Sequence, residues 1–238
     1  GLGAGPVDLI RHQGRLYAAT GVGTFYLRPR SEGSPAEFVR VDGVRNQCWW
    51  FASVEDPEGT RGPQLLLAAS AGLFRIDGDR ATAIKAPTDA PFRTSLVYQS
   101  KVDPDRVWVG LFDGLASFRW QDGEWVDEGR VRGVTDQVRT LYENPDGSLW
   151  AGTQATGLMR LRFEGLAKRQ ARPETAVVER FGVAEGLQPG AVFVLPAGGQ
   201  PYFLQVGDET RLVVRFDEQS RTFVIEKRFE IVGTNTLS

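Results

Sequence analysis

Residues suited to nucleophilic or metal chemistry are scarce in this sequence. His12 is the only histidine and Cys48 the only cysteine among 238 residues. A zinc site needs three or four His, Cys or carboxylate ligands, and a Ser-His-Asp triad would have to use His12. His12 reads as a solvated residue in a turn between two strands. Cys48 stands in an apolar run, as is typical of a small buried hydrophobe. We therefore expect no metal and no cofactor.

Carboxylates are the remaining candidates for catalysis. Pairs of acids close in sequence occur at several places, for example Asp103 with Asp105, Asp127 with Glu128, and Glu143 with Asp146. A glycosidase needs two opposed carboxylates, one of them with a raised pKa. Most of these acids fall in turn sequences, where solvation and turn hydrogen bonds account for them. The sequence also lacks a phosphate-binding glycine loop, so we predict that the chain is not an enzyme.

A repeated pattern of short strands must position the remaining polar residues. The best copy, residues 138–161, reads as three strands, with a strong turn signal at 144–147. Its second strand carries a large residue that recurs at intervals of 41 to 53 residues: Tyr17, Leu67, Trp108, Trp150 and Phe203. A fourth strand is expected after each copy, at 37–41, 81–85, 124–126, 176–181 and 222–226. The only helix-like stretch is 166–170.

A period of 40 to 50 residues with four short strands per unit is the signature of a propeller. We predict an all-β chain, a β-propeller of about five four-stranded blades that belongs to a larger seven-bladed or tandem propeller. The approximate blades are 7–45, 46–90, 91–133, 134–188 and 189–230. Trp108 and Trp150 should fill the wedges between blades, while Ala151 and Gly152 allow close approach near the axis.

The fourth unit resembles a known family. Its run 141–153, LYENPDGSLWAGT, followed by Gly157 and Leu158, is similar to the two-component regulator propeller repeat. Asn144 stands where that repeat favours Asp, and Thr156 where it favours Gly. The segment 179–187 is similar to the connector that leads from a fourth strand to the next blade in this family.

The resemblance implies a non-catalytic, extracytoplasmic sensor or ligand-binding module of a bacterial signal-transduction protein. In this family, a membrane span and a histidine kinase or diguanylate cyclase follow the propeller, so downstream signalling modules of the same chain are expected partners. Because the sequence begins with Gly1, we interpret it as a segment of a longer protein. We expect it in the periplasm, with the cytoplasm as the alternative location. A homodimer is a further candidate assembly.

Other function classes stay open from the sequence. One is a protein–protein interaction scaffold without a small ligand, and another is a propeller lyase or glycoside hydrolase. The net charge of −2 gives no indication of nucleic acid as a partner. The sequence contains no apolar run of 18 residues, so we expect no direct membrane insertion.

Topology predicts where a ligand would bind. In an up-and-down blade, the start of the first strand and the loop between the second and third strands meet at one end of the central channel. The candidate residues at this channel face are Arg139, Arg93, Trp49, Trp50, Tyr98, Gln47, Gln137, Asp113 and Gln154. Aromatic rings mixed with planar polar groups suit a small polar ligand, a sugar or a carboxylate. In the alternative interpretation, Trp49 and Trp50 belong to the core between blades and the arginines line a water-filled channel.

Overall fold

Twenty short strands account for nearly all regular structure in the described part of this protein. The computed structural model describes residues 2, 4–28, 35–55, 59, 62–86, 91–163, 172–207 and 211–229. The strands are β1 (Pro6–His12), β2 (Arg15–Thr20), β3 (Gly23–Arg28), β4 (Glu37–Arg40), β5 (Cys48–Val54), β6 (Gln64–Ala69), β7 (Gly72–Asp77), β8 (Arg80–Lys85), β9 (Thr94–Gln99), β10 (Arg106–Leu111), β11 (Gly114–Gln121), β12 (Glu124–Arg130), β13 (Val138–Glu143), β14 (Leu149–Thr153), β15 (Leu158–Phe163), β16 (Ala176–Phe181), β17 (Ala191–Ala197), β18 (Gln200–Val206), β19 (Arg211–Asp217) and β20 (Thr222–Ile225). The described residues also contain the short 3-10 helices η2 (Pro173–Thr175), η3 (Val183–Glu185) and η4 (Lys227–Phe229).

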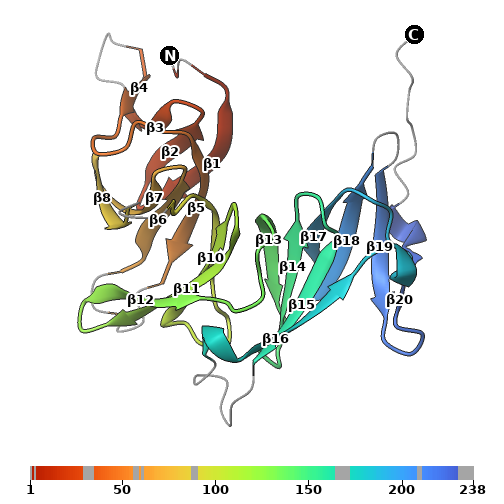
Figure 1. Ribbon diagram of the computed structural model, residues 1–238. Helices are drawn as coiled ribbons and strands as arrows, with labels where there is room; N and C mark the ends of the chain where they lie inside the picture. The colour runs from red at the N-terminus through yellow and green to blue at the C-terminus, as the bar shows by residue number, and fades with distance from the viewer. Residues whose placement is uncertain are drawn as a thin grey trace, which may run out of the picture.

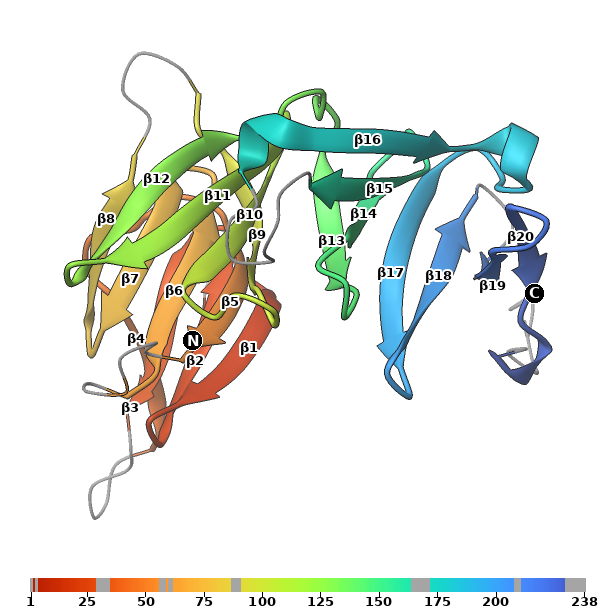
Figure 2. The ribbon, with the colours of Figure 1, turned by 90° about the horizontal axis from the view of Figure 1, so that it is seen from below.

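The strands form five separate four-stranded antiparallel sheets, each made of four consecutive strands in sequence order. We number these sheets blades 1 to 5, from β1–β4 to β17–β20. They follow one another along an arc, with blades 1 and 5 at its two ends and the first strand of each blade on the inner side (Figures 1 and 2). The prediction of an all-β propeller with five four-stranded units is confirmed. The helix-like stretch 166–170 lies outside the described residues.

The inner blades are covered on both faces, which explains their apolar sequences. Every residue of β10 and of β14 is buried, because alternate side chains face the preceding and the following blade. Apolar clusters accordingly fill the four interfaces between consecutive blades. Cys48 belongs to the cluster between blades 1 and 2, as expected of a buried hydrophobe. Burial raises the pKa of its thiol to about 11.

The direction in which each second strand points corrects part of the repeat alignment. Trp108 and Trp150 are buried and face the following blade, as predicted, and Tyr17 does the same in blade 1. Leu67 and Phe203 instead face the preceding blade. One step along a strand reverses the face, so the equivalents of the tryptophans in blades 2 and 5 are Leu66 and Tyr202. In both blades two large apolar residues stand side by side, so residue size could not decide between them.

Glycine is required where consecutive blades come closest. A Cβ on Gly152 would collide with the backbone oxygen of Val192 in blade 5. Gly110 occupies the equivalent place in blade 3, where a Cβ would lie 2.7 Å from the oxygen of Val138 in blade 4. The predicted close approach near the axis is therefore present at Gly152, and its repetition at Gly110 sets the spacing between the inner edges of blades 3, 4 and 5.

The two ends of the arc expose apolar residues that inner blades bury. Leu9 of β1 pairs with Ala18, on the face of blade 1 that points away from blade 2, and is 52% exposed. Leu195 of β17 lies on the face of blade 5 that points away from blade 4 and is 38% exposed. The corresponding first-strand residues Phe51 and Tyr142 of the inner blades are buried. Among the described residues, no helix has the length and apolarity needed to cross a bilayer.

Candidate binding site

One backbone contact recurs at the channel end of three blades. The amide of the residue after the second strand donates to the carbonyl of a residue at or just before the start of the first strand. These pairs are Ser70 to Gln47 (2.8 Å), Phe112 to Arg93 (3.1 Å) and Gln154 to Gln137 (3.1 Å). The first-strand starts and the loops after the second strands therefore meet, as topology predicts. Gln47 and Gln137 serve this arrangement through their backbone oxygens.

Irregular pairing at the start of the first strands re-aims selected side chains. In β5 the register shifts between Cys48 and Trp50, so Trp49 has no direct partner in β6. In β13 the register shifts between Val138 and Thr140, so Arg139 has no direct partner in β14. Arg139 therefore occupies in blade 4 the position that Trp49 occupies in blade 2. A β-bulge of this kind bends the strand and turns the extra residue out of the regular alternation. Trp49 and Arg139 are thereby free to reach across the blades.

These two residues meet between the blades that carry them. The Arg139 guanidinium lies 5.4 Å from the Trp49 ring, and the Trp49 and Phe112 rings are 5.6 Å apart. The Arg93 guanidinium lies 4.1 Å from the Phe112 ring, and Arg139 donates to Gln154 Oε1 at 3.2 Å. We call Trp49, Arg93, Phe112, Arg139 and Gln154 the channel-face cluster. Blades 2, 3 and 4 each contribute to it.

The charge of this cluster is not balanced by the protein. Within the part of the chain that the structure describes, neither Arg93 nor Arg139 forms an ion pair with a carboxylate. Burial lowers the pKa of the Arg139 guanidinium, because a desolvated cation is less stable, although an arginine this basic stays charged at neutral pH. Two cations held against two aromatic rings can bind a planar anion through bidentate hydrogen bonds and stacking. Trp49 is fixed further by its indole N–H, which donates to Ser70 Oγ at 3.2 Å.

The structure places three of the predicted site residues away from this cluster. Trp50 pairs with Ala68 and is 45% exposed, so the alternative that it belongs to the core between blades is wrong. Asp113 turns outward to Arg130, with the two charges 3.1 Å apart. Tyr98 lies near the end of β9 that is opposite the channel end, paired with Trp108.

Tyr98 was assigned to the wrong end of the blade because it was grouped with the start of the first strand. It lies four residues after Thr94, the first residue of β9, and therefore near the other end of that strand. Its hydroxyl accepts the backbone N–H of Glu143 at 3.2 Å, so it joins blades 3 and 4. Sequence reasoning also missed Phe112 and Ser70. Ser70 directly follows β6, and Phe112 directly follows β10, next to the predicted Asp113. The aromatic side chain of Phe112 at this loop position was the signal that could have identified it.

Most of the carboxylates considered for catalysis are held by basic or backbone partners. Asp103 is buried and accepts a hydrogen bond from Arg119 at 2.6 Å, while Glu128 accepts from both Arg106 and Arg119 at 2.9 Å. Although burial alone would raise it, these bonds and one from Ser117 lower the pKa of Glu128. The carboxylate is therefore ionised at neutral pH and unsuited to the role of a general acid.

Glu143 and Asp146 have equally local roles. Glu143 is buried and accepts hydrogen bonds from Ser100 Oγ and from the backbone of the turn after β9. This contact joins blade 4 to blade 3. Asp146 accepts from the Ser148 amide at 2.9 Å within the turn 144–148. Among the described residues, no three His, Cys, Asp or Glu side chains gather where they could hold a metal.

His12 differs from its prediction. It is the last residue of β1 and only 8% exposed, with Nδ1 3.1 Å from Ser53 Oγ of blade 2. Burial lowers its pKa, so the ring is neutral at neutral pH. A histidine at the junction of two blades was mistaken for a turn residue because Gln13 and Gly14, which follow it, form the turn.

Comparison with known proteins gives matches in structure but none in sequence. No protein-family model matches the chain, and no curated protein matches it. Solved structures do: the extracellular domain of BT4673, a proposed one-component or hybrid two-component system of B. thetaiotaomicron, has a TM-score of 0.60 at 14% identity. The match covers at least 93% of this chain but only 28% of that one.

Propellers of other kinds match as well. A proposed 6-phosphogluconolactonase from Bacteroides fragilis has a TM-score of 0.56 at 14% identity, covering 94% of this chain and 69% of that one. The β-propeller domain of Cps50 (Swd1) from Myceliophteria thermophila has a TM-score of 0.52 at 12% identity, covering 82% and 64%. The protein is thus of the β-propeller class. At such low sequence identities, the similarity shows the fold alone, so the function must be argued from the residues of the candidate site.

Proposed function

We propose that this chain is the ligand-binding part of a bacterial sensor propeller that acts outside the cytoplasm and has no catalytic activity. The observation that carries the proposal is the channel-face cluster, in which Arg93 and Arg139 have no ionic partner among the described residues and lie against Phe112 and Trp49. A small sugar or carboxylate is the ligand class that this chemistry suits. The likeness to an extracellular domain of a signalling protein agrees with this function.

The exposed faces of blades 1 and 5 concern what lies next to this part of the propeller. Leu9 and Leu195 stand where inner blades are covered by a neighbour. We propose that further blades of a longer propeller cover these faces and that signalling modules of the same polypeptide receive the output. A homodimer through an end face is the alternative occupant.

Two other functions compete with this proposal. An interaction scaffold would use the blade surfaces and leave the channel-face cluster occupied by water. An enzyme, whether a lyase, a glycoside hydrolase or a lactonase such as the B. fragilis neighbour is proposed to be, would need a free acid or base. Asp127 lies 2.5 Å from Lys85 Nζ. With the exception of Asp105, the carboxylates we weighed for catalysis therefore have structural partners, which favours binding over catalysis.

Ligand-induced stabilisation tests the proposal. We expect one member of a panel of small carboxylates and acidic sugars to raise the free energy of unfolding by about 2.7 kcal/mol at a hundredfold excess over its Kd. The Arg139→Ala variant should lose this shift and keep the melting temperature of the unliganded protein. The matched control is Arg162→Ala, which removes an exposed arginine paired with Glu179 and should retain the shift. A panel without effect, or a shift that survives Arg139→Ala, would contradict the proposed site.

A further inference from the structure

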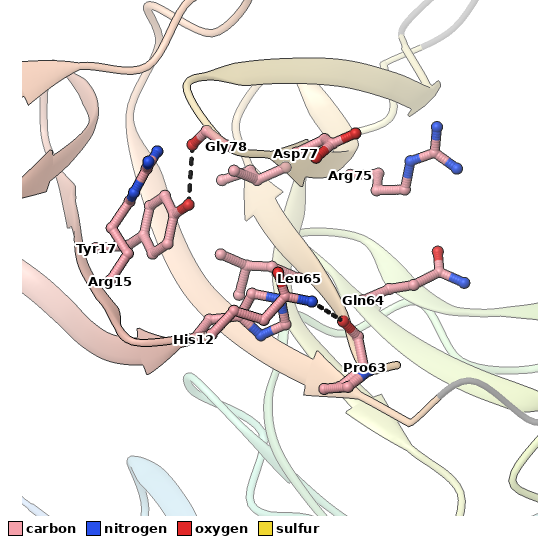
Figure 3. Close-up of a pocket in the computed structure, with 11 residues that line it drawn as sticks. His12, Arg15, Tyr17, Pro63, Gln64, Leu65, Arg75, Asp77 and Gly78 are labelled. Atoms are coloured by element: carbon pink, nitrogen blue, oxygen red, sulfur yellow. Dashed lines mark hydrogen bonds between the residues drawn. The ribbon is translucent and has the colours of Figure 1, made fainter. Parts of the chain in front are cut away.

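A cavity of about 370 Å³ lies between blades 1 and 2, at the end of the blades opposite the channel-face cluster (Figure 3). Its walls are the end of β1, the start of β2, the start of β6 and the end of β7. Small-molecule sites begin at roughly 300 Å³, so the cavity can hold a molecule rather than a few waters. We call it the first groove.

Hydrogen bonds between the two blades hold the first groove open. Tyr17 Oη of β2 donates to the Gly78 carbonyl after β7 at 2.9 Å, which fixes the ring against the wall (Figure 3). Gln13 Nε2 donates to the Pro63 carbonyl at 3.4 Å, and His12 is tied to Ser53. Because both sides are anchored to each other, the space needs no rearrangement before a ligand enters, which lowers the cost of binding.

The charged residues of the first groove are not neutralised by ion pairs with other described residues. Arg15, Arg75 and Asp77 line it, and none of them forms an ion pair within the described parts of the chain. The Arg15 guanidinium lies 4.7 Å from the Tyr26 ring, beside Tyr17 (Figure 3), and this contact fixes its position without neutralising it. Two cations and one anion line the groove, and a second carboxylate, Asp79, is close enough to act on Tyr17. The groove therefore offers guanidinium donors beside a carboxylate that can accept hydrogen bonds.

The corresponding groove between blades 4 and 5 provides an internal comparison. It holds about 240 Å³ and is bordered by Trp150, Arg160, Arg215 and Glu218. Here the protein neutralises its own cations: Arg160 lies 2.7 Å from Glu218, and Arg215 lies 3.8 Å from Glu226. We call it the second groove. The unpaired charges of the first groove are therefore not a general consequence of two blades meeting.

We propose that the first groove binds a small hydroxylated carboxylate, no larger than a single sugar acid. Arg15 would take the carboxylate through its planar guanidinium, and Asp77 would accept hydrogen bonds from ligand hydroxyls. Arg75 adds attraction from the rim, where Figure 3 shows its guanidinium pointing away from Tyr17. The site is separate from the channel-face cluster, so it stands whether or not that cluster binds a ligand.

Calorimetric titration of the whole chain with D-glucuronate tests this assignment. Neutral D-glucose should give at least tenfold weaker binding, because it cannot pair with Arg15, and sulfate should bind more weakly than glucuronate because it lacks hydroxyls. Raising the ionic strength should weaken glucuronate binding, since the contact is charged and partly exposed. Equal affinities for glucose and glucuronate, or no binding of glucuronate, would overturn the proposal.

Variants locate the site. Arg15→Gln should weaken glucuronate binding at least tenfold, while Arg139→Gln in the channel-face cluster should leave it unchanged. The opposite result would move the ligand to the channel face and refute this site while supporting the proposed function. Asp77 is exposed, so Asp77→Asn tests the same groove without a risk to folding, and we expect a severalfold loss. Unchanged affinity in both Arg15→Gln and Asp77→Asn would refute the assignment.

Discussion

The first and second grooves show how one scaffold gives two different interiors. Between blades 4 and 5, the Trp150 ring lies 5.0 Å from Phe203 and 5.3 Å from both Phe181 and Phe216. Between blades 1 and 2, Tyr17 takes the place of the tryptophan and lies 6.3 Å from Phe51. The backbone arrangement is the same, but fewer and smaller rings leave more space in the first groove.

The difference separates residues that hold blades together from residues that are free to bind. Where aromatic packing is dense, the remaining charges pair with each other, as Arg160 does with Glu218. Where packing is looser, Arg15 and Asp77 form no ion pair with another described residue. Position in the repeat therefore fixes where a groove forms, and the side chains at a few positions decide whether it is filled.

The largest expected effect is on the aromatic interface. We expect Trp150→Ala to lower the free energy of unfolding by about 3–5 kcal/mol, the range for truncating a large buried aromatic residue, because four rings around it would lose their partner. Urea denaturation measures this loss. Trp50→Ala, at an exposed position, is the control and should change stability little. A loss below about 1 kcal/mol for Trp150→Ala would show that the second groove does not depend on this packing.

Much of this architecture was predictable because the turns and strands of the repeat are determined by residues close together in the sequence. The turn at 144–147, the apolar second strands and the fourth strand at 176–181 each follow from nearby residues, and β16 has the predicted bounds. Where the local signal was weak, the errors were of one or a few residues. The strand expected at 124–126 extends to Arg130, and Leu67 was chosen instead of Leu66.

The residues of the proposed sites were harder to predict because their positions depend on contacts between blades. Topology brought Trp49, Arg93, Arg139 and Gln154 to one end correctly. The bulges that turn Trp49 and Arg139 together have no distinctive local sequence, and Tyr98 was misplaced by the length of one strand. The first groove could not be foreseen at all, since Arg15 and Asp77 belong to different blades and nothing in the sequence pairs them.

A smaller effect should distinguish the grooves by pH. Burial lowers the pKa of His12 in the folded protein, so the unfolded chain binds a proton more readily. The stability that neutral His12 contributes is present above its unfolded pKa of about 6.5 and is lost as the pH falls toward the folded value.

Since His12 is the only histidine, the interval from pH 7.5 to 5.5 isolates this effect. We expect urea midpoints to fall with pH in the native protein and to fall less in His12→Asn. Identical pH dependence in the two proteins would mean that the ring is protonated as easily in the first groove as in water. No comparable titration is expected from the described lining of the second groove, which contains no histidine.

The smallest effect on stability should come from converting the second groove toward the first. Glu218 is 63% exposed, so Glu218→Gln should change the free energy of unfolding by no more than about 1 kcal/mol, as for surface ion pairs. The substitution nevertheless frees the Arg160 guanidinium, which remains 5.1 Å from the Trp150 ring. If an unpaired guanidinium held against an aromatic ring is what makes the first groove a carboxylate site, the second groove should gain a weak site of the same kind.

The measurement is glucuronate titration in an Arg15→Gln background, where we expect weak binding to return on adding Glu218→Gln. Glu179→Gln, which frees Arg162 and Arg221 on an open surface, is the matched control and should restore nothing. Failure of Glu218→Gln to restore binding would show that the free charge is not sufficient and that the larger volume beside Tyr17 determines which groove takes a ligand.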